Sequence, residues 1–425
     1  MMRPRTIILS FLVFCALLYP LVLWQKERIF SSIPAMDDAT SWFWIAQPIV
    51  FALFFFALSA GIRKRILCYA CIIAASFFFT FAVAEVYFRL QRFAARQADT
   101  AFHSPDSVHV KSGQATHLYE KGYSVPDPVL GYGPNEKTRI AARSQQGDKV
   151  IYDVLYSKDG ENRRITPDHG DKADAAILLF GCSFTFGEGL NDRETFAWQL
   201  GEMLGERFQV FNFGFHGYGS HQMLALVESG RLDSLTRRYK QVYAFYLTIR
   251  SHEPRCLGLG LGPGLWQWDE NGPRYILENG VLKYAGKFSG TKLPQLPEYP
   301  LLERLFPHSK LYVEAKLAYH RWLLSDLGFN THAAIIAKSM QELHTRYHAH
   351  ALTVIWPDYT RIEQKLRDSG VRTLLLTDAM PDYASTPKKY ELEVDRHPNA
   401  LANTRIAQAL AAYILKNTHT TGEWQ

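Results

Sequence analysis

Cysteines are scarce in this chain, and their positions argue against a disulfide framework or a structural zinc site. Five of the 425 residues are cysteine, and three of the five lie inside long apolar runs. Only Cys182 and Cys256 remain, and two cysteines form one bridge at most. Outside the apolar runs there is no Cys-x-x-Cys pair with metal-binding spacing. We therefore expect no metal site and no disulfide-stabilised fold.

A surplus of charge is also lacking outside the first 96 residues. The chain has 47 Lys and Arg against 41 Asp and Glu, and residues 1–96 contain the whole surplus. The remainder is neutral, whereas a protein that binds nucleic acid presents a basic face. We therefore expect no nucleic acid among its partners.

Residues 1–96 contain three long apolar runs instead, and these exclude a purely soluble protein. The runs cover residues 6–24, 45–62 and 66–90. A helix rises about 1.5 Å per residue, so each run is long enough to cross a bilayer. No small-residue cleavage site follows the first run, which favours a retained anchor over a signal peptide. The sequence thus predicts a membrane anchor of three transmembrane helices.

Basic residues around these runs predict the orientation of the anchor. Two arginines precede the first run, and an Arg-Lys-Arg triplet follows the second. Such residues in short loops favour the cytoplasmic side, so three spans place everything after Leu90 outside the cytoplasm. Three arginines at the end of the third run favour the reverse. Glu85 in that run is a functional candidate, although its place near the end of the run favours solvation at the membrane surface.

Beyond the anchor the pattern of apolar residues changes twice. Residues 97–122 are polar and weakly patterned, as in a linker, and residues 123–170 show the alternation of β-strands. From residue 175 there are five short apolar runs, typical of strands buried on both faces: AAILLFG, FQVFNFG, QVYAFYL, LTVIWP and VRTLLL. Helical patterns lie between and after them, near residues 193–205, 219–232, 331–348, 360–369 and 400–416. We therefore predict an α/β domain over residues 123–425, with a parallel sheet covered by helices on both sides.

One stretch interrupts the alternation of strands and helices. Residues 255–330 contain a glycine-rich loop and two Asn-Gly hairpin signals, so we expect an insertion. Trp266 and Trp268 lie within it, two residues apart. Their rings would suit stacking on a sugar, or they pack beneath the insertion, and the sequence leaves both possibilities open.

A serine follows the first of the five apolar runs. The sequence there is Phe-Gly-Cys-Ser-Phe, with the serine at Ser183. Ligand sites of open parallel sheets lie beyond the carboxyl ends of strands, where Ser183 would present its hydroxyl. The alternative is a helix N-cap. The pattern is also not the G-x-S-x-G of an ordinary α/β-hydrolase, because Thr185 takes the fifth place.

An Asp-x-His sequence precedes the last amphipathic pattern. Pro398 favours an extended backbone at His397. Residues two apart in an extended segment project to the same side, so Asp395 would reach the His397 ring. A carboxylate on one ring nitrogen fixes the tautomer and leaves the other nitrogen to deprotonate a serine. The alternative is a turn in which Asn399 caps the next helix.

A glycine-rich block follows the second apolar run. Its sequence is NFGFHGYG, over residues 212–219. Glycines let backbone N–H groups approach a ligand closely, and two such donors would hold the oxyanion that forms in acyl transfer. The alternative is a connection that needs glycine only for its turn.

In this order along the chain, the three blocks resemble those of the SGNH/GDSL hydrolase family, over roughly residues 127–415. FGCSFTFGEGL is similar to the first block, with Ser183 as nucleophile. NFGFHGYGSHQ is similar to the glycine block, with Gly217 at the oxyanion position beside Ser183 N–H. DRHPN is similar to the last block, with His397 as base and Asp395 as its orienting acid. The resemblance implies a three-layer α/β/α sandwich (SGNH-like) and ester chemistry at a serine, with no cofactor.

Two positions depart from the family's pattern. Cys182 stands where the family has Asp, and we expect it to pack as a small apolar group. The family's third-block Asn is missing, because Thr-Ile-Arg-Ser-His follows QVYAFYL. Either Arg250 or His252 supplies an oxyanion or substrate contact there, or one donor is lost. Such a loss typically costs about a hundredfold or more in rate.

The segment before Ser183 is similar to a β-rich prelude of membrane-anchored bacterial members, some of which acylate envelope glycans. The resemblance implies a multi-pass protein of the bacterial cytoplasmic membrane with its C-terminal domain on the periplasmic side. We expect an esterase or acyltransferase for O-acyl groups, chiefly O-acetyl, of envelope glycans. Its partners would be an acylated glycan or other ester and proteins of an envelope polysaccharide pathway. A catalytically weak glycan-binding or assembly component and a lipid esterase are the alternatives.

Overall fold

The computed structural model describes most of the chain as two compact units. The residues outside its description are 1–40, 63, 101–106, 113–114, 121–122, 259–270, 290–299, 307–308, 395 and 419–425. The first unit is Met1–His103 with Leu296–Trp322, and the second is Ser104–Gln295 with Leu323–Gln425. The first apolar run, residues 6–24, therefore lies outside the described residues.

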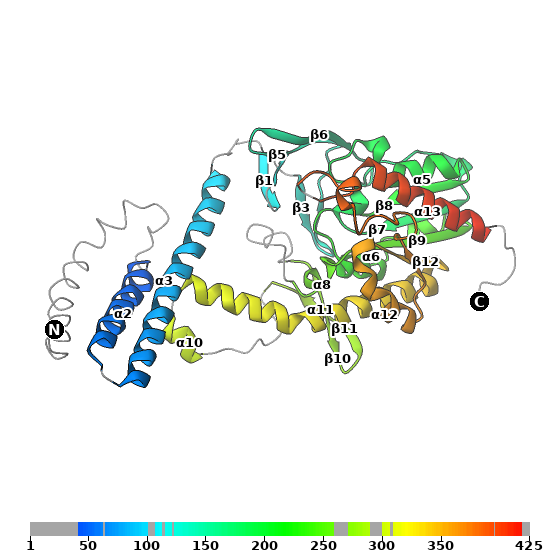
Figure 1. The fold of residues 1–425 in the computed structure, drawn as a ribbon. Coiled ribbons are helices and arrows are strands. Elements are labelled where there is room, and N and C mark those ends of the chain that lie inside the picture. The colour runs from blue at the N-terminus through cyan, green and yellow to red at the C-terminus, as the bar shows by residue number, and fades with distance from the viewer. Residues whose placement is uncertain are drawn as a thin grey trace. The chain divides into compact units, whose positions relative to one another are not determined.

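The first unit is helical. Its helices are α2 (Ser41–Gly61), α3 (Arg65–Thr100), α10 (Pro300–Leu305) and the beginning of α11 (Lys310–Tyr347). Phe55 of α2 stacks on Phe78 of α3, with ring centroids 5.8 Å apart. The two helices lie side by side along this apolar seam (Figure 1).

Within the described residues, one helix is long and apolar enough to cross a membrane. It covers Arg65–Leu90, with a mean hydropathy of 2.3. The apolar part of α2 is only Gln47–Ser59, which at about 1.5 Å per residue is shorter than the roughly 30 Å hydrocarbon core. Among the described residues, the structure therefore bears out the length and hydropathy predicted for the third run only, because the continuous apolar stretch of the second run is too short for a bilayer of ordinary thickness.

Glu85 of α3 caps the N-terminus of α11. Its carboxylate accepts the backbone N–H groups of Lys310 at 2.8 Å and Leu311 at 2.9 Å, and the Ser309 hydroxyl at 3.0 Å. Arg89, one turn along α3, donates its Nε–H to the same carboxylate at 3.0 Å. Glu85 is completely buried, so the expected solvation at a membrane surface is wrong. The cap satisfies N–H groups that have no partner inside a helix.

The second unit begins with antiparallel strands. A four-stranded sheet has the order β1 (Ser107–Ser112), β2 (Ala115–Glu120), β5 (Arg139–Gln146) and β6 (Lys149–Ser157). A hairpin of β3 (Ser124–Asp127) and β4 (Gly131–Pro134) accompanies it. β1 and β2 lie within residues 97–122, the expected linker, where Lys and His residues among the apolar ones weaken the strand pattern.

A five-stranded parallel sheet forms the centre of the second unit. Its order is β13 (Thr373–Leu375), β12 (His350–Ile355), β9 (Gln241–Thr248), β7 (Ala175–Phe180) and β8 (Phe208–Asn212). Every neighbouring pair is parallel. The chain runs from β7 outward to β8 and then crosses back to β9. The direction of winding thus reverses between β7 and β9, where ligands bind in open sheets of this kind.

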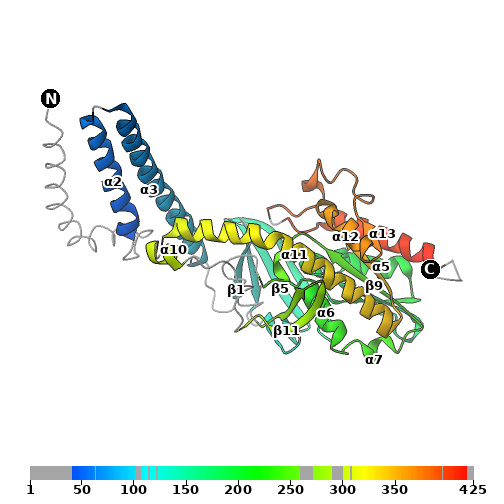
Figure 2. The same ribbon diagram turned by 90° about the horizontal axis from the view of Figure 1, so that it is seen from below.

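Helices cover both faces of this sheet, which confirms the predicted α/β/α arrangement. α5 (Phe196–Leu204) and α13 (Ala400–Thr418) lie on one face. α6 (Ser220–Glu228), α12 (Glu363–Asp368) and the later part of α11 lie on the other (Figures 1 and 2). The five strands are those predicted from the apolar runs. α11 begins at Lys310, twenty-one residues before the predicted helix.

Apolar packing beneath α13 fixes the position of this helix, which begins just after His397. Ile406 and Leu410 of α13 and Leu200 of α5 are fully buried against Ile177 and Phe245 of the sheet. Burying one such aliphatic side chain stabilises a fold by about 1.5–3 kcal/mol. This packing holds the N-terminal end of α13 over the carboxyl edge of the sheet.

The predicted insertion contains one hairpin among its described residues. β10 (Pro273–Glu278) pairs with β11 (Val281–Lys287) through Asn279 and Gly280, which both have positive φ. That turn confirms one of the two Asn-Gly signals. Short helical turns complete the unit: α4 (Ser183–Phe186), α7 (Asp233–Thr236), α8 (His252–Arg255) and the 3₁₀ turns Gly170–Lys172, Asp192–Glu194, Pro357–Ile362 and Pro387–Lys389.

Candidate active site

Ser183 lies at the start of the one-turn helix α4, directly beyond the end of β7. Gly181 makes the sharp turn possible. It has a φ of +153°, and a Cβ there would lie 2.1 Å from Thr185 Oγ1 and 3.2 Å from the Leu247 carbonyl oxygen. No larger residue fits between the two chain segments. Ser183 itself is 6% exposed, so its hydroxyl is held in a nearly closed site at the carboxyl edge of the sheet.

His397 meets Ser183 across 214 residues of sequence. Its Nε2 lies 2.8 Å from Ser183 Oγ, the distance at which an imidazole takes a proton from a hydroxyl. The Phe184 ring packs beside the imidazole, with centroids 5.3 Å apart. The structure therefore brings these two predicted residues together. Asp395, the predicted orienting acid, lies outside the described residues.

The segment that presents His397 is held by Asn399, two residues further on. Asn399 accepts the Ala402 N–H at 3.1 Å and so caps α13, and its own N–H donates to the Tyr390 carbonyl at 2.9 Å. Val394 and Arg396 have positive φ values of 74° and 65°, a left-handed conformation that costs L-residues roughly 1–2 kcal/mol each. Strain of this kind persists where the surrounding structure fixes the backbone, often beside a functional residue.

The glycine block packs against the Ser183 turn. Asn212, at the end of β8, donates its side-chain amide to the Thr185 carbonyl at 2.8 Å and accepts the Gly214 N–H at 2.9 Å. A Cβ on Gly214 would lie 2.7 Å from the Phe186 nitrogen. Gly217 has a φ of +75°, and a Cβ there would lie 2.6 Å from Tyr132 Oη. Both glycines are therefore required by close approach, and Gly217 also by its backbone conformation.

A buried carboxylate, Glu188, connects the Ser183 turn with the glycine block. It accepts hydrogen bonds from the hydroxyls of Tyr119, at 2.6 Å, and Tyr152. His216 Nδ1 contacts its other oxygen. His117 Nδ1 lies 2.8 Å from Tyr152 Oη and 3.8 Å from the carboxylate. No pattern in the sequence indicated this cluster, because its tyrosines come from β2 and β6 and Glu188 itself follows a glycine in a loop.

The charges of the cluster determine its protonation. Burial alone would raise the pKa of Glu188, but His216, His397 and His117 outweigh burial and lower that pKa below its usual value. Burial, followed by the charge of Glu188, raises the pKa values of Tyr119 and Tyr152 well above 10. The glutamate is therefore an acceptor and the tyrosines are donors throughout the physiological range.

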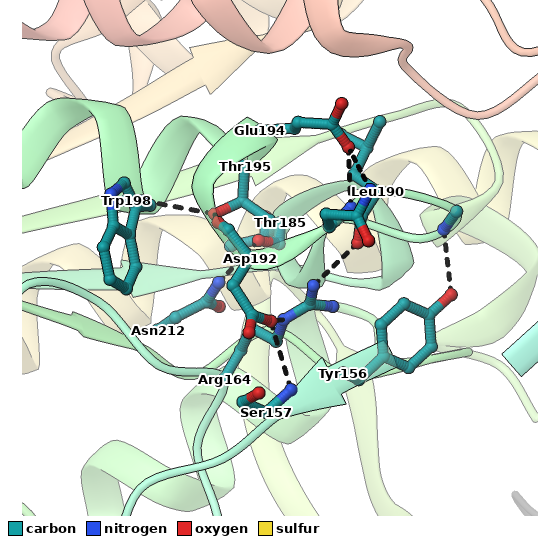
Figure 3. A network of polar contacts seen from close by, with 12 residues as sticks. Tyr156, Ser157, Arg164, Thr185, Leu190, Asp192, Glu194, Thr195, Trp198 and Asn212 are labelled. Carbon is teal, nitrogen blue, oxygen red and sulfur yellow. Dashed lines mark hydrogen bonds and ion pairs between the residues drawn. The ribbon is translucent and has the colours of Figure 1, made fainter. Parts of the chain in front are cut away.

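Arg164 supports the loop that follows Ser183 (Figure 3). Its guanidinium donates to the Leu190 carbonyl at 2.7 Å and to Asp192 at 3.0 Å. The same group lies 4.4 Å from the centre of the Tyr156 ring, and Tyr156 Oη accepts the Gly189 N–H at 2.9 Å. Arg164 is 1% exposed. A buried cation that is paired in this way fixes the loop between Ser183 and α5.

The comparisons with known proteins add a weak likeness of fold. No protein-family model matches the chain, and no curated protein matches its sequence. It is similar to the structure of a lipolytic G-D-S-L family member from Veillonella parvula, at 10% identity and a TM-score of 0.31, over 57% of this chain and 98% of that one. It is also similar to LAE5, an alpha/beta hydrolase enzyme from the Lake Arreo metagenome, at 14% identity and a TM-score of 0.31, over 60% and 100%.

The residues expected to replace the missing Asn have other surroundings. His252 is fully buried, and its Nδ1 lies 2.6 Å from Tyr246 Oη. Burial, and then Arg255, lowers the pKa of His252 well below 6.5, so its ring is neutral. Arg250 is exposed just after β9. Within the described part of the chain, no hydrogen bond joins either residue to Ser183. Trp266 and Trp268 lie outside the described residues.

Cys182 and a second serine–histidine pair are buried next to the sheet. Cys182 is fully buried among apolar side chains. Ser220 Oγ lies 2.8 Å from His332 Nδ1, and Thr248 Oγ1 lies 2.8 Å from the other ring nitrogen. All three side chains are completely buried. This second pair is therefore closed to substrate, in contrast to Ser183 and His397.

Proposed function

We propose that the chain is a serine-dependent esterase or acyltransferase that works through an acyl-serine intermediate. The 2.8 Å contact between Ser183 Oγ and His397 Nε2 carries this proposal. The pair lies at the carboxyl edge of a parallel sheet, beside a glycine-rich loop that can supply backbone donors. These are the parts that nucleophilic acyl chemistry requires.

The reaction begins when His397 Nε2 takes the proton of Ser183. Ser183 Oγ then attacks the carbonyl carbon of an ester, and the carbonyl electron pair moves onto oxygen. The backbone N–H groups of Ser183 and Gly217 stabilise this oxyanion. The intermediate collapses, the C–O bond to the leaving alcohol breaks, and the alcohol takes its proton from His397. Asp395 orients the imidazole in this scheme and stabilises its positive charge.

The second half of the reaction removes the acyl group from Ser183. Water, deprotonated by His397, attacks the acyl-serine. The bond between the acyl carbon and Ser183 Oγ then breaks, His397 returns the proton to Ser183 Oγ, and the carboxylic acid leaves. If a sugar hydroxyl attacks in its place, the product is an O-acylated sugar and the enzyme is a transferase. Both outcomes share the same intermediate, so the same residues serve either reaction.

The proposed substrate is an O-acyl, chiefly O-acetyl, group on a glycan of the cell envelope. Two features support it. The chain contains a helix long and apolar enough to tether it to a membrane, and Trp266 and Trp268 lie in the insertion next to the sheet in sequence. Aromatic rings suit the apolar faces of sugars. Proteins of an envelope polysaccharide pathway are the proposed partners, and a periplasmic location of the domain belongs to the same proposal.

A fluorophosphonate probe tests the nucleophile. We expect the wild-type chain to be labelled, Ser183→Ala to be unlabelled, and Ser220→Ala to be labelled at the wild-type rate. Ser220 is the matched control because it also pairs with a histidine, at the same 2.8 Å. Intact-protein mass spectrometry with acyl donors would then identify the group carried on Ser183. No labelling of a folded wild-type chain contradicts the enzyme proposal.

A glycan-binding or assembly component of little activity is the second candidate. The missing third-block Asn favours it, since the Thr248 hydroxyl at the end of β9 is bonded to His332 rather than directed at a substrate. This candidate predicts binding of an acylated oligosaccharide by Ser183→Ala and by wild type with equal affinity, together with no fluorophosphonate labelling of either.

A further inference from the structure

We propose that Glu188 is a positioning residue of this site: it holds His216 and thereby fixes the loop that carries Gly217. The inference rests on the proposed function, because it assigns a role to residues around the same nucleophile. It adds a carboxylate and a histidine that the sequence pattern did not include.

The position of Glu188 is fixed relative to the nucleophile. Its backbone N–H donates to the Ser183 carbonyl at 3.0 Å, and the Gly187 N–H donates to the same oxygen at 2.9 Å. Gly187 ends α4 in a left-handed conformation, with φ at 87°. The chain therefore turns within five residues of Ser183 and returns the Glu188 carboxylate to the interior, where it is 2% exposed.

His216 connects the Glu188 carboxylate to the loop that carries Gly217. Its ring contacts the Glu188 carboxylate, and its own carbonyl accepts the Tyr132 hydroxyl at 2.8 Å. The next residue is Gly217. Tyr218, one further on, donates its hydroxyl to the Tyr132 carbonyl at 2.8 Å. The peptide that bears the Gly217 N–H is thus held by its own carbonyl oxygen and by the side chain of the preceding residue.

Burying the charge of Glu188 costs free energy, which argues against a purely structural role. Within the described residues its polar contacts are Tyr119, Tyr152, His216 and His117, with no Lys or Arg among them. An isolated buried carboxylate costs several kcal/mol unless a counter-charge and hydrogen bonds offset the cost. The two tyrosine hydroxyls and the His216 ring are the groups that offset it here. Buried charges of this kind concentrate at functional sites.

The contact between Glu188 and His216 has a direct consequence for the rate of the proposed reaction. An oxyanion donor acts only if its N–H lies about 2.7–3.1 Å from the developing charge. A displacement of about 1 Å near the reacting atoms costs up to roughly a hundredfold. Releasing His216 from Glu188 would allow the Gly217 peptide to shift. Transition-state stabilisation would fall, while binding of the ground-state ester would change little.

A double-mutant cycle on the full chain tests this inference. We expect Glu188→Gln and His216→Asn each to lower kcat for p-nitrophenyl acetate about 10- to 100-fold, with KM changed less than about twofold. Because the two residues act through one contact, the double variant should lose no more than the worse single variant. Glu253→Gln is the control, since Glu253 is also buried and pairs with Arg361 outside this cluster.

The results would distinguish the positioning role of Glu188 from the proposed enzyme activity at Ser183. Wild-type kcat in the folded Glu188→Gln chain, or losses that simply multiply in the double variant, would overturn the positioning role and leave the nucleophile intact. No labelling of wild type by fluorophosphonate would overturn the enzyme itself. If Glu188→Gln fails to fold, His216→Asn alone decides by the same split between kcat and KM.

Discussion

Gly217 is the residue whose backbone the proposed chemistry depends on most. Its φ of +75° disfavours any L-residue, and a Cβ there would lie 2.6 Å from Tyr132 Oη. We expect Gly217→Ala to lower kcat about a hundredfold or more, the loss typical of an oxyanion donor. Steady-state kinetics of the folded variant would measure it.

Gly147 provides the matched control for that substitution. It has a φ of +56°, but a Cβ there would meet nothing within 4 Å. Gly147→Ala is therefore destabilised by its backbone conformation but not by a collision of the added Cβ with a neighbouring atom. Equal effects of the two substitutions on kcat would show that general destabilisation, not the position of the Gly217 peptide, is responsible.

The Glu188 carboxylate also makes the stability of the fold depend on pH. Despite burial, which acts to raise it, the Glu188 pKa is lowered in the folded chain by His216, His397 and His117. A depressed pKa stabilises the fold above the unfolded value of about 4.3, and this contribution is lost as the pH falls toward the folded value. We expect the wild-type advantage in unfolding free energy over Glu188→Gln to be larger near about pH 5 than near about pH 3. Urea denaturation in detergent would measure it, and an advantage that grows over this interval would contradict the assigned shift.

Sequence patterns predicted part of the site, for physical reasons visible at single residues. Ser183 and His397 stand next to strongly patterned elements, a buried strand and an amphipathic helix, so their places could be predicted. Glu188 could not, because a glutamate between two glycines has the pattern of an exposed loop. Its partners come from β2 and β6, strands whose pairing with the rest of the chain no local pattern specifies.

At the scale of elements, the five central strands were predictable because each is buried on both faces and therefore continuously apolar. The N-terminal half of α11 was not predictable in the same way. Residues 310–330 have exposed tyrosine and tryptophan side chains, such as Tyr319 and Trp322, so their apolar positions do not follow one helical face. The beginning of α11 is set by a contact with α3.

The contact between Glu85 of α3 and the beginning of α11 leads to a testable prediction for α11. Glu85 accepts the first backbone N–H groups of α11, and removing a cap typically costs about 1–2 kcal/mol. We expect Glu85→Ala to speed hydrogen exchange at the Lys310 and Leu311 amides roughly 5- to 30-fold. Mass spectrometry of peptides covering these residues would measure it. Glu342→Ala is the control, because Glu342 pairs with Lys338 in the same helix. Unchanged exchange in Glu85→Ala would contradict the cap.

At the scale of the whole molecule, the number of membrane crossings decides which compartment the domain occupies. With the N-terminus in the cytoplasm, three crossings put the domain outside. If α2, with its short apolar stretch Gln47–Ser59, does not cross, two crossings return the domain to the cytoplasm. An envelope glycan is reachable only in the first case, so the proposed substrate depends on α2 spanning despite its length, through thinning of the bilayer or snorkelling of flanking side chains.

Labelling of single cysteines distinguishes the two arrangements. Val281, at the tip of the β10–β11 hairpin, is 56% exposed, and Lys64 lies exposed between α2 and α3. For an external domain, a membrane-impermeant maleimide should label Val281→Cys in intact cells and Lys64→Cys only after lysis, with the parent chain as background. The opposite pattern would mean that α2 does not cross, or that three spans cross in the reverse orientation. It would exclude envelope glycans as substrates but leave the Ser183 chemistry possible on a cytoplasmic ester.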